Sequence, residues 1–102
     1  MKKIVLAFGI ICFFLWGCIT VPPPNEEYTL SRAALDAAKS VQAARYSPGF
    51  WHQSEEYYRQ AKILYGEREY EDAKILFLKA KAAAEKAENS ARLLRQKNGD
   101  VL

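Results

Sequence analysis

The sequence has few of the residues from which catalytic and metal sites are built. Its 102 residues include one histidine, His52, and two cysteines. It contains no His-Glu-x-x-His metal motif and no glycine-rich phosphate-binding motif. A general base also needs partners that orient it, and the sequence displays none for His52. We therefore expect no metal site, no catalytic residue, no enzymatic activity and no small-molecule substrate, with catalysis by His52 as the remaining alternative.

Alternation of apolar and polar residues, the pattern of a half-buried strand, is also missing. From Asn25 onward the apolar residues instead recur at intervals of three and four, which predicts α-helix. Asn25 is expected to cap the first helix, Ser47 the second, and Gly66 to end the second. The expected helices cover residues 26–45, 48–65 and 69–97 within a domain of residues 26–98, followed by a tail of residues 99–102.

Each expected helix carries one apolar stripe that alternates four- and three-residue steps. The stripes are Leu30, Ala34, Ala37, Val41 and Ala44; then Phe50, Ser54, Tyr57, Ala61 and Leu64; then Tyr70, Ala73, Phe77, Ala80, Ala84, Ala87, Ala91 and Leu94. This alternation is typical of closely packed helices, and the alanines allow the backbones to approach closely. Because the connections are short, neighbouring helices must run antiparallel. The predicted fold is all-α, an up-down-up three-helix antiparallel bundle.

The first seventeen residues have the pattern of an export signal. Lys2 and Lys3 precede an apolar block from Ile4 to Trp16, which is followed by the small Gly17. The alternative is an uncleaved membrane anchor, since the apolar stretch is near the lower length limit for spanning a bilayer. We interpret residues 1–17 as a signal peptide and residues 18–25 as a proline-rich tether. Either interpretation holds the chain at a membrane.

The residues Leu15-Trp16-Gly17-Cys18 resemble the lipobox of bacterial lipoproteins. The resemblance implies cleavage before Cys18, a diacylglycerol on its sulfur and an acyl chain on its new amine. Trp16 departs from the pattern, in which smaller residues are usual. Ile19 stands where an inner-membrane retention signal has aspartate, so the resemblance implies the periplasmic side of the outer membrane. The expected membrane partner is lipid, reached through Cys18.

Cleavage at this point changes the charge and the cysteine count. Loss of Lys2 and Lys3 leaves 13 basic and 12 acidic residues, a net charge of about +1. No nucleic-acid partner is implied by that balance. Cys12 would leave with the signal peptide, which would leave Cys18 as the lipid carrier and exclude disulfides. The prolines of the tether favour an extended chain, which would hold the domain roughly 20 Å from the membrane.

Two further resemblances concern the helical part. The segment YYRQAKILYGEREYEDAKILFLKA is similar to one tetratricopeptide repeat, through Ala61 and through Tyr70, Ala73, Phe77 and Ala80. No second repeat is visible, which implies a single repeat-like hairpin and not a solenoid. The range 32–91 resembles an uncharacterised family of bacterial envelope domains, whose members are often exported lipoproteins. That family brings no assigned activity.

Two groups of apolar residues are candidates for partner binding. Trp51 and Tyr58 belong to an aromatic cluster and share a stripe beside the apolar seam, where they either cap the core or form a recognition patch. Ile75 and Leu78, with Ala82, form a second apolar stripe on the third helix, which indicates scattered surface apolarity, self-association or docking of a partner helix.

Together these features favour a structural or adaptor lipoprotein that binds an envelope protein through a helical face. A pilot-type chaperone for a secretion or pilus component is the alternative. A deep apolar groove between helices would favour the chaperone, and a flat face would favour the adaptor.

Overall fold

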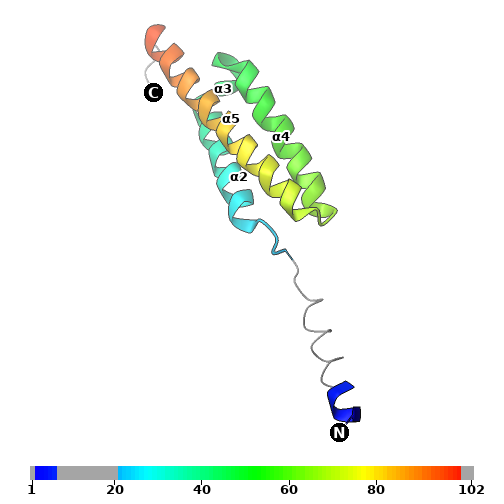
Figure 1. The fold of residues 1–102 in the computed structure, drawn as a ribbon. Helices are drawn as coiled ribbons and strands as arrows, with labels where there is room; N and C mark the ends of the chain where they lie inside the picture. Colours follow the sequence, from blue (N-terminus) through cyan, green and yellow to red (C-terminus); the bar gives the residue numbers. More distant parts are fainter. Residues whose placement is uncertain (1, 7–20, 100–102) are drawn as a thin grey trace.

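The computed structural model describes residues 2–6 and 21–99, and the described part of the chain is helical without any strand. Residues 2–6 are helical, and four further helices follow the tether (Figure 1). These helices are α2 (Asn25–Ser40), α3 (Ala43–Tyr46), α4 (Pro48–Gly66) and α5 (Tyr70–Lys97). The predicted all-α class is therefore confirmed.

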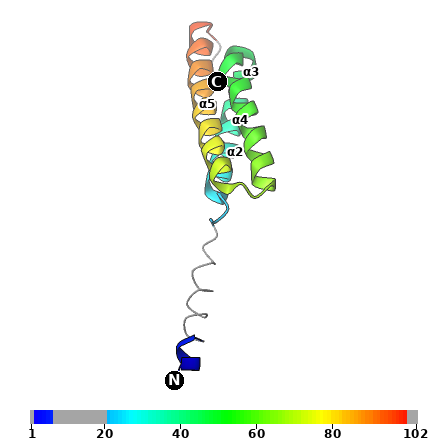
Figure 2. The ribbon, with the colours of Figure 1, turned by 45° about the vertical axis from the view of Figure 1, so that its right-hand side comes forward.

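The three long helices form an elongated body in which α5 holds the other two. Both α2 and α4 pack along α5, whereas they make few contacts with each other. The short α3 links α2 to α4 at the end far from residue 21, and α4 runs opposite to α2 and α5 (Figure 1). The same arrangement is visible after rotation, with α5 alongside both neighbours (Figure 2). The side chains on α5 therefore decide how closely the helices can pack.

The packed face of α5 is made almost entirely of alanine. Its fully buried residues are Ala73, Phe77, Ala80, Ala84, Ala87 and Ala91. These residues lie on the stripe that the sequence predicts, and the helix covers 28 residues, close to the predicted 69–97. The two ends of the predicted stripe are less buried: Tyr70 is half-buried and Leu94 is 37% exposed. Small side chains allow α2 and α4 to lie close to α5.

The core has two parts of different composition. Near α3, six small residues pack together: Ala38, Val41, Ala43, Ala84, Ala87 and Ala91. Near the tether, Phe77 is the largest fully buried side chain and packs with Ala61 and Ala73. Tyr28, Tyr58 and Tyr65 surround its ring, with centroids at 5.0, 6.0 and 6.3 Å from the Phe77 centroid. Most of the bulky apolar contact is therefore at the tether end.

The first helix ends earlier than predicted. Helix α2 stops at Ser40, and the chain turns through Gln42, which has a left-handed φ of 60°. The prediction of one helix over 26–45 is wrong for this reason. The turn buries Ala43 in the alanine cluster and leaves Ala44 exposed, so the predicted place of Ala44 in the stripe is also wrong. Burial of Val41 and Ala43 offsets a left-handed residue that costs roughly 1–2 kcal/mol.

The fully buried residues of α2 lie one position after the predicted stripe, although the predicted Ala34 packs against the alanine cluster and the predicted Val41 is buried. Leu30 is 42% exposed, whereas the neighbouring Ser31 is fully buried. The shift brings Tyr28 against the Phe77 ring. Ser31 Oγ donates to the carbonyl of Tyr28 at 2.9 Å, so its burial leaves no hydroxyl without a partner. The prediction that Leu30 faces the core is wrong because the tyrosine and the small serine fit there together.

The capping predictions are only partly correct. Asn25 caps nothing; it is the first helical residue, and its Oδ1 accepts a hydrogen bond from the hydroxyl of Tyr65 at 2.7 Å. Ser47 occupies the N-cap position of α4 with Pro48 in the first turn, but its side chain makes no capping bond. Helix α4 ends at Gly66 as predicted, yet the left-handed residue of the turn is Arg68, with φ 62°.

We expect Phe77→Ala to destabilise the protein by about 3–5 kcal/mol, because Phe77 fills the centre of the tyrosine cluster and its loss leaves a cavity. The free energy of unfolding, measured by urea denaturation, tests this. Ile63→Ala is the control, since Ile63 is 49% exposed on α4 and should cost less than about 1 kcal/mol. Equal losses for the two variants would contradict the described core.

Candidate binding groove

An open groove of about 940 Å³ runs between α2 and α4. Both helices pack mainly on α5, and their few direct contacts include those of Tyr28 with Tyr58 and Tyr65. The lining residues of the groove come from these two helices: Arg32, Leu35, Asp36, Lys39, Trp51, His52, Glu55, Glu56, Tyr58, Arg59 and Lys62. The groove is therefore a surface formed by the packing of separate chain segments, with a few apolar residues and many charged ones.

The apolar part of the groove consists of Leu35, Trp51 and Tyr58. All three side chains are half-buried. Leu35 and Trp51 pack on the alanine cluster, and Tyr58 packs on Phe77 and its neighbours. Trp51 and Tyr58 are seven residues apart, so they lie about two turns apart on one face of α4. The structure thus brings together the two aromatic residues that the sequence singled out, and it adds Leu35.

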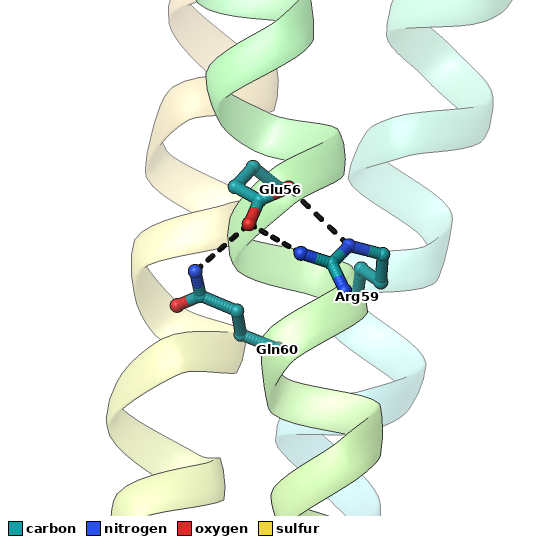
Figure 3. Close-up of polar contacts among 3 residues, drawn as sticks. All are labelled: Glu56, Arg59 and Gln60. Carbon is teal, nitrogen blue, oxygen red and sulfur yellow. Dashed lines mark hydrogen bonds and ion pairs between the residues drawn. The ribbon is translucent and has the colours of Figure 1, made fainter.

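The walls of the groove carry both signs of charge. On α4, the carboxylate of Glu56 accepts hydrogen bonds from Arg59 Nη2 at 2.6 Å, from Arg59 Nε at 3.3 Å and from Gln60 Nε2 at 2.9 Å (Figure 3). Arg59 and then Gln60 lower the pKa of Glu56, and Glu56 in turn raises the pKa of Arg59. This network pairs one acid with one base on the solvent-exposed part of the wall.

Tyr58 stands at the junction between groove and core. Burial, and then the nearby Tyr28, raise the pKa of Tyr58 to about 12. The Lys62 ammonium lies 4.8 Å from the centre of the Tyr58 ring, a cation–π contact at the groove edge. The ring therefore belongs to both places: it packs against the Phe77 cluster and also lines the groove. The core-cap interpretation of the aromatic cluster applies to Tyr58, and the recognition surface stays a prediction.

The other two candidate residues lie on a different surface. Ile75 is 51% exposed and Leu78 is 44% exposed, both on α5, and neither lines the groove. Leu93, at 61%, is exposed on the same helix and was not singled out from the sequence. The four predicted partner-binding residues therefore form two surfaces. Cys18, the predicted lipid attachment point, lies outside the described residues.

His52 also lines the groove, but its surroundings are simple. Its Nδ1 lies 3.8 Å from Glu55 Oε1, and the two side chains are 76% and 51% exposed. The described residues contain no group of three or more histidine, cysteine, aspartate or glutamate side chains that could hold a metal ion. Within residues 2–6 and 21–99, no helix is both long enough and apolar enough to cross a bilayer.

Sequence reasoning missed Leu35, Tyr28 and Tyr65. A signal for Tyr28 was present, since Tyr28, Ser31, Leu35 and Ala38 also alternate steps of three and four. That register competes with the one through Leu30, and hydrophobicity alone favours the latter. Leu35 follows once the register is corrected, whereas Tyr65 depends on the contact between α2 and the end of α4.

These features define a small all-helical domain with an open groove between two of its helices. The chain belongs to the family described as Domain of unknown function (DUF4398), whose model matches residues 26–99. This agrees with the expected membership of an uncharacterised family. No curated protein and no solved structure matches the chain.

When the pH is raised from 10 to 12, we expect the free energy of unfolding to fall less in the Tyr58→Phe variant than in the parent. The pKa of Tyr58 is raised from 10.0 to about 12 on folding, so its stabilising effect is complete below pH 10. The effect is lost as the pH rises through the folded-state value. Urea denaturation at pH 9 and pH 11 measures the difference, and an equal fall in both proteins would contradict the burial of this hydroxyl.

Proposed function

We propose that this protein is a membrane-anchored periplasmic lipoprotein that acts as a non-enzymatic adaptor. Its groove binds one helical segment of an envelope protein. The observation that carries the proposal is that the half-buried side chains of Leu35, Trp51 and Tyr58 together line an open groove between α2 and α4. Apolar side chains that remain accessible in a groove are typical of a docking site.

The shape of the groove favours a helix as the bound element. Helices α2 and α4 flank the groove, and both pack on α5. A partner helix laid between α2 and α4 would therefore be the fourth helix of a compact arrangement. Trp51 and Tyr58, two turns apart, would contact one apolar stripe of that helix, and Leu35 would contact it from the other wall. Acidic and basic residues on both walls would then pair with charges beside the stripe, which provides specificity and orientation.

The adaptor role is favoured over a pilot-type chaperone. A chaperone that shields an apolar segment needs a deep apolar groove, and here eight of the eleven lining residues are charged or histidine. Such walls suit a partner that is itself folded and amphipathic. The pilot role is the alternative. Identification of the bound protein would decide between the adaptor and the pilot.

We infer the anchor from the sequence around Cys18. A diacylglycerol and an N-acyl chain on this residue would hold the domain at the outer membrane, and multiple acyl chains give stable attachment. The prolines before Asn25 would separate the domain from the lipid. Helix α2 begins directly after them and reaches the groove at Arg32, so the groove would face the periplasm at more than the length of the tether from the membrane.

We further infer that the body is a three-helix bundle with one tetratricopeptide-like hairpin formed by α4 and α5. Support comes from the small and aromatic residues of the repeat pattern, since Ala61, Ala73, Phe77 and Ala80 are all fully buried. A single repeat leaves one face of the hairpin to be covered by another helix. In this chain α2 takes that place.

Mutation of Cys18 should abolish lipid attachment. We expect parent protein from cells to begin at Cys18 and to carry fatty acid, as measured by metabolic palmitate labelling and mass spectrometry of the N-terminal peptide. Cys18→Ala should retain residues 1–17 and carry no label. Cys12→Ala is the matched control and should be processed like the parent. A mature N-terminus upstream of Cys18 without fatty acid would contradict the anchor.

Photo-crosslinkers placed in cells at Trp51 or at Tyr58 should capture the same envelope protein, because both side chains line the groove. A crosslinker at Ile63, which is exposed and does not line the groove, is the control and should not capture it. Leu35→Glu should abolish capture from Tyr58 while circular dichroism shows unchanged helix content. Equal capture from Ile63, or capture that survives Leu35→Glu, would contradict the groove as the binding site.

A further inference from the structure

The outward face of α5 carries a second apolar surface, which we call the outer stripe: Ile75, Leu78, Ala82 and Leu93. At 100° per residue these four positions fall within about 60° of the helix circumference. That sector is opposite the buried alanines, and the described structure leaves all four residues exposed. The outer stripe is separate from the groove between α2 and α4, so its role does not depend on the groove.

The two ends of the outer stripe are symmetric about the middle of α5, whereas Leu78 and Ala82 have Ser90 and Lys86 at the mirrored positions. Ile75 and Leu93 are the same number of residues from position 84, one toward each end of α5. If two copies of α5 lay antiparallel across a two-fold axis at that level, Ile75 of each copy would meet Leu93 of the other. Ala82 lies next to the axis, where its small side chain leaves room for Lys86 of the other copy. We propose that the outer stripe is the interface of an antiparallel homodimer.

Charge at the two ends of α5 favours a second copy in this orientation. The first turn contains the acids Glu71 and Asp72, and the last turn contains the bases Arg95 and Lys97. Asp72 and Lys97 form no ion pair within the described part of the chain. Antiparallel pairing would place Asp72 of each copy near Lys97 of the other. Parallel pairing would place acid against acid and base against base, which is unfavourable.

Repulsion between lysines near the axis opposes the pairing, so the strength of the dimer should depend on charge at these positions. Lys79 and Lys86 lie on the same side of the outer stripe, so the antiparallel arrangement brings these lysines of both copies together. Lys79 is drawn toward α4, with its ammonium 5.9 Å from the centre of the Tyr57 ring. The dimer is therefore weak, and a change of charge at Lys86 should strengthen it.

The dimer would leave both grooves accessible. Because α2 and α4 cover the opposite side of α5, each groove faces away from the outer stripe. A pair of copies would display two grooves on opposite sides, and a protein with two binding sites gains avidity for a repeated partner.

Cysteine crosslinking between full-length copies tests the interface. One copy with Ile75→Cys is produced together with a differently tagged copy with Leu93→Cys, and disulfide-linked pairs are measured on non-reducing gels. Parent copies, which contain only Cys12 and Cys18, set the background. We expect linked heterodimer from the mixture and only background from either variant alone.

Three outcomes would overturn the proposal. Crosslinks between two copies that both carry Ile75→Cys would indicate parallel pairing. Background crosslinking in the mixture would indicate that α5 does not self-associate. Crosslinks from either variant only to a different protein would assign the outer stripe to another partner.

Charge and apolar variants supply a second, independent measurement. Lys86→Glu should raise the yield of linked heterodimer about two- to fivefold, because the introduced carboxylate would pair with Lys79 of the second copy. Leu78→Glu should reduce the yield to background with unchanged helix content, because it places a charge in the apolar contact. No rise with Lys86→Glu, or undiminished yield with Leu78→Glu, would overturn the proposed register.

Discussion

The close approach of helices on the alanine face of α5 determines the rest of the structure. Helices α2 and α3 pack closely against α5 at Ala84, Ala87 and Ala91. Nearer the tether, the small buried residues of α5 are Ala73 and Ala80. Each alanine buries little area, so stability depends on the number of such contacts and on the few large side chains. Because α2 and α4 are each held mainly by α5 and contact each other at few places, a groove remains between them.

Aromatic residues supply the large apolar contacts that alanine side chains are too small to make. Phe77 and the tyrosines around it supply the largest apolar contact in the described core, and Tyr65 ties α4 to the start of α2 through Asn25. Tyr58 and Trp51 extend this packing to the surface. The same side chains therefore stabilise the domain and form its candidate binding surface, so mutations that test binding must be checked for folding.

Most of α5 and part of α4 could be predicted from the sequence because each helix has one clear apolar stripe. The exception on α4 is Phe50, the first residue of the predicted stripe, which is 41% exposed. Phe77 and its alanine neighbours have no competing register on α5. In α2 two registers compete, and the larger Leu30 favours the wrong one, while the buried Ser31 is polar in sequence and satisfied only by its own helix. The turn at Gln42, which ends α2 early, contains no glycine or proline from which it could be predicted. Trp51 and Tyr58 could be recognised from the sequence as candidates. The groove that they line could not be predicted, because it depends on where α2 packs relative to α4 and local sequence patterns do not determine that.

The central claim is that alanine contacts on α5 set the separation of α2 and α4. Spin labels at Asp36 and Glu55, one on each wall of the groove, measure that separation by pulsed electron paramagnetic resonance in the parent and in Ala84→Leu. A single narrow distance distribution is predicted for the parent. A broader or displaced one is predicted for the variant, because a leucine overfills the contact with Ala38 and Val41. An unchanged distribution in Ala84→Leu would contradict the claim.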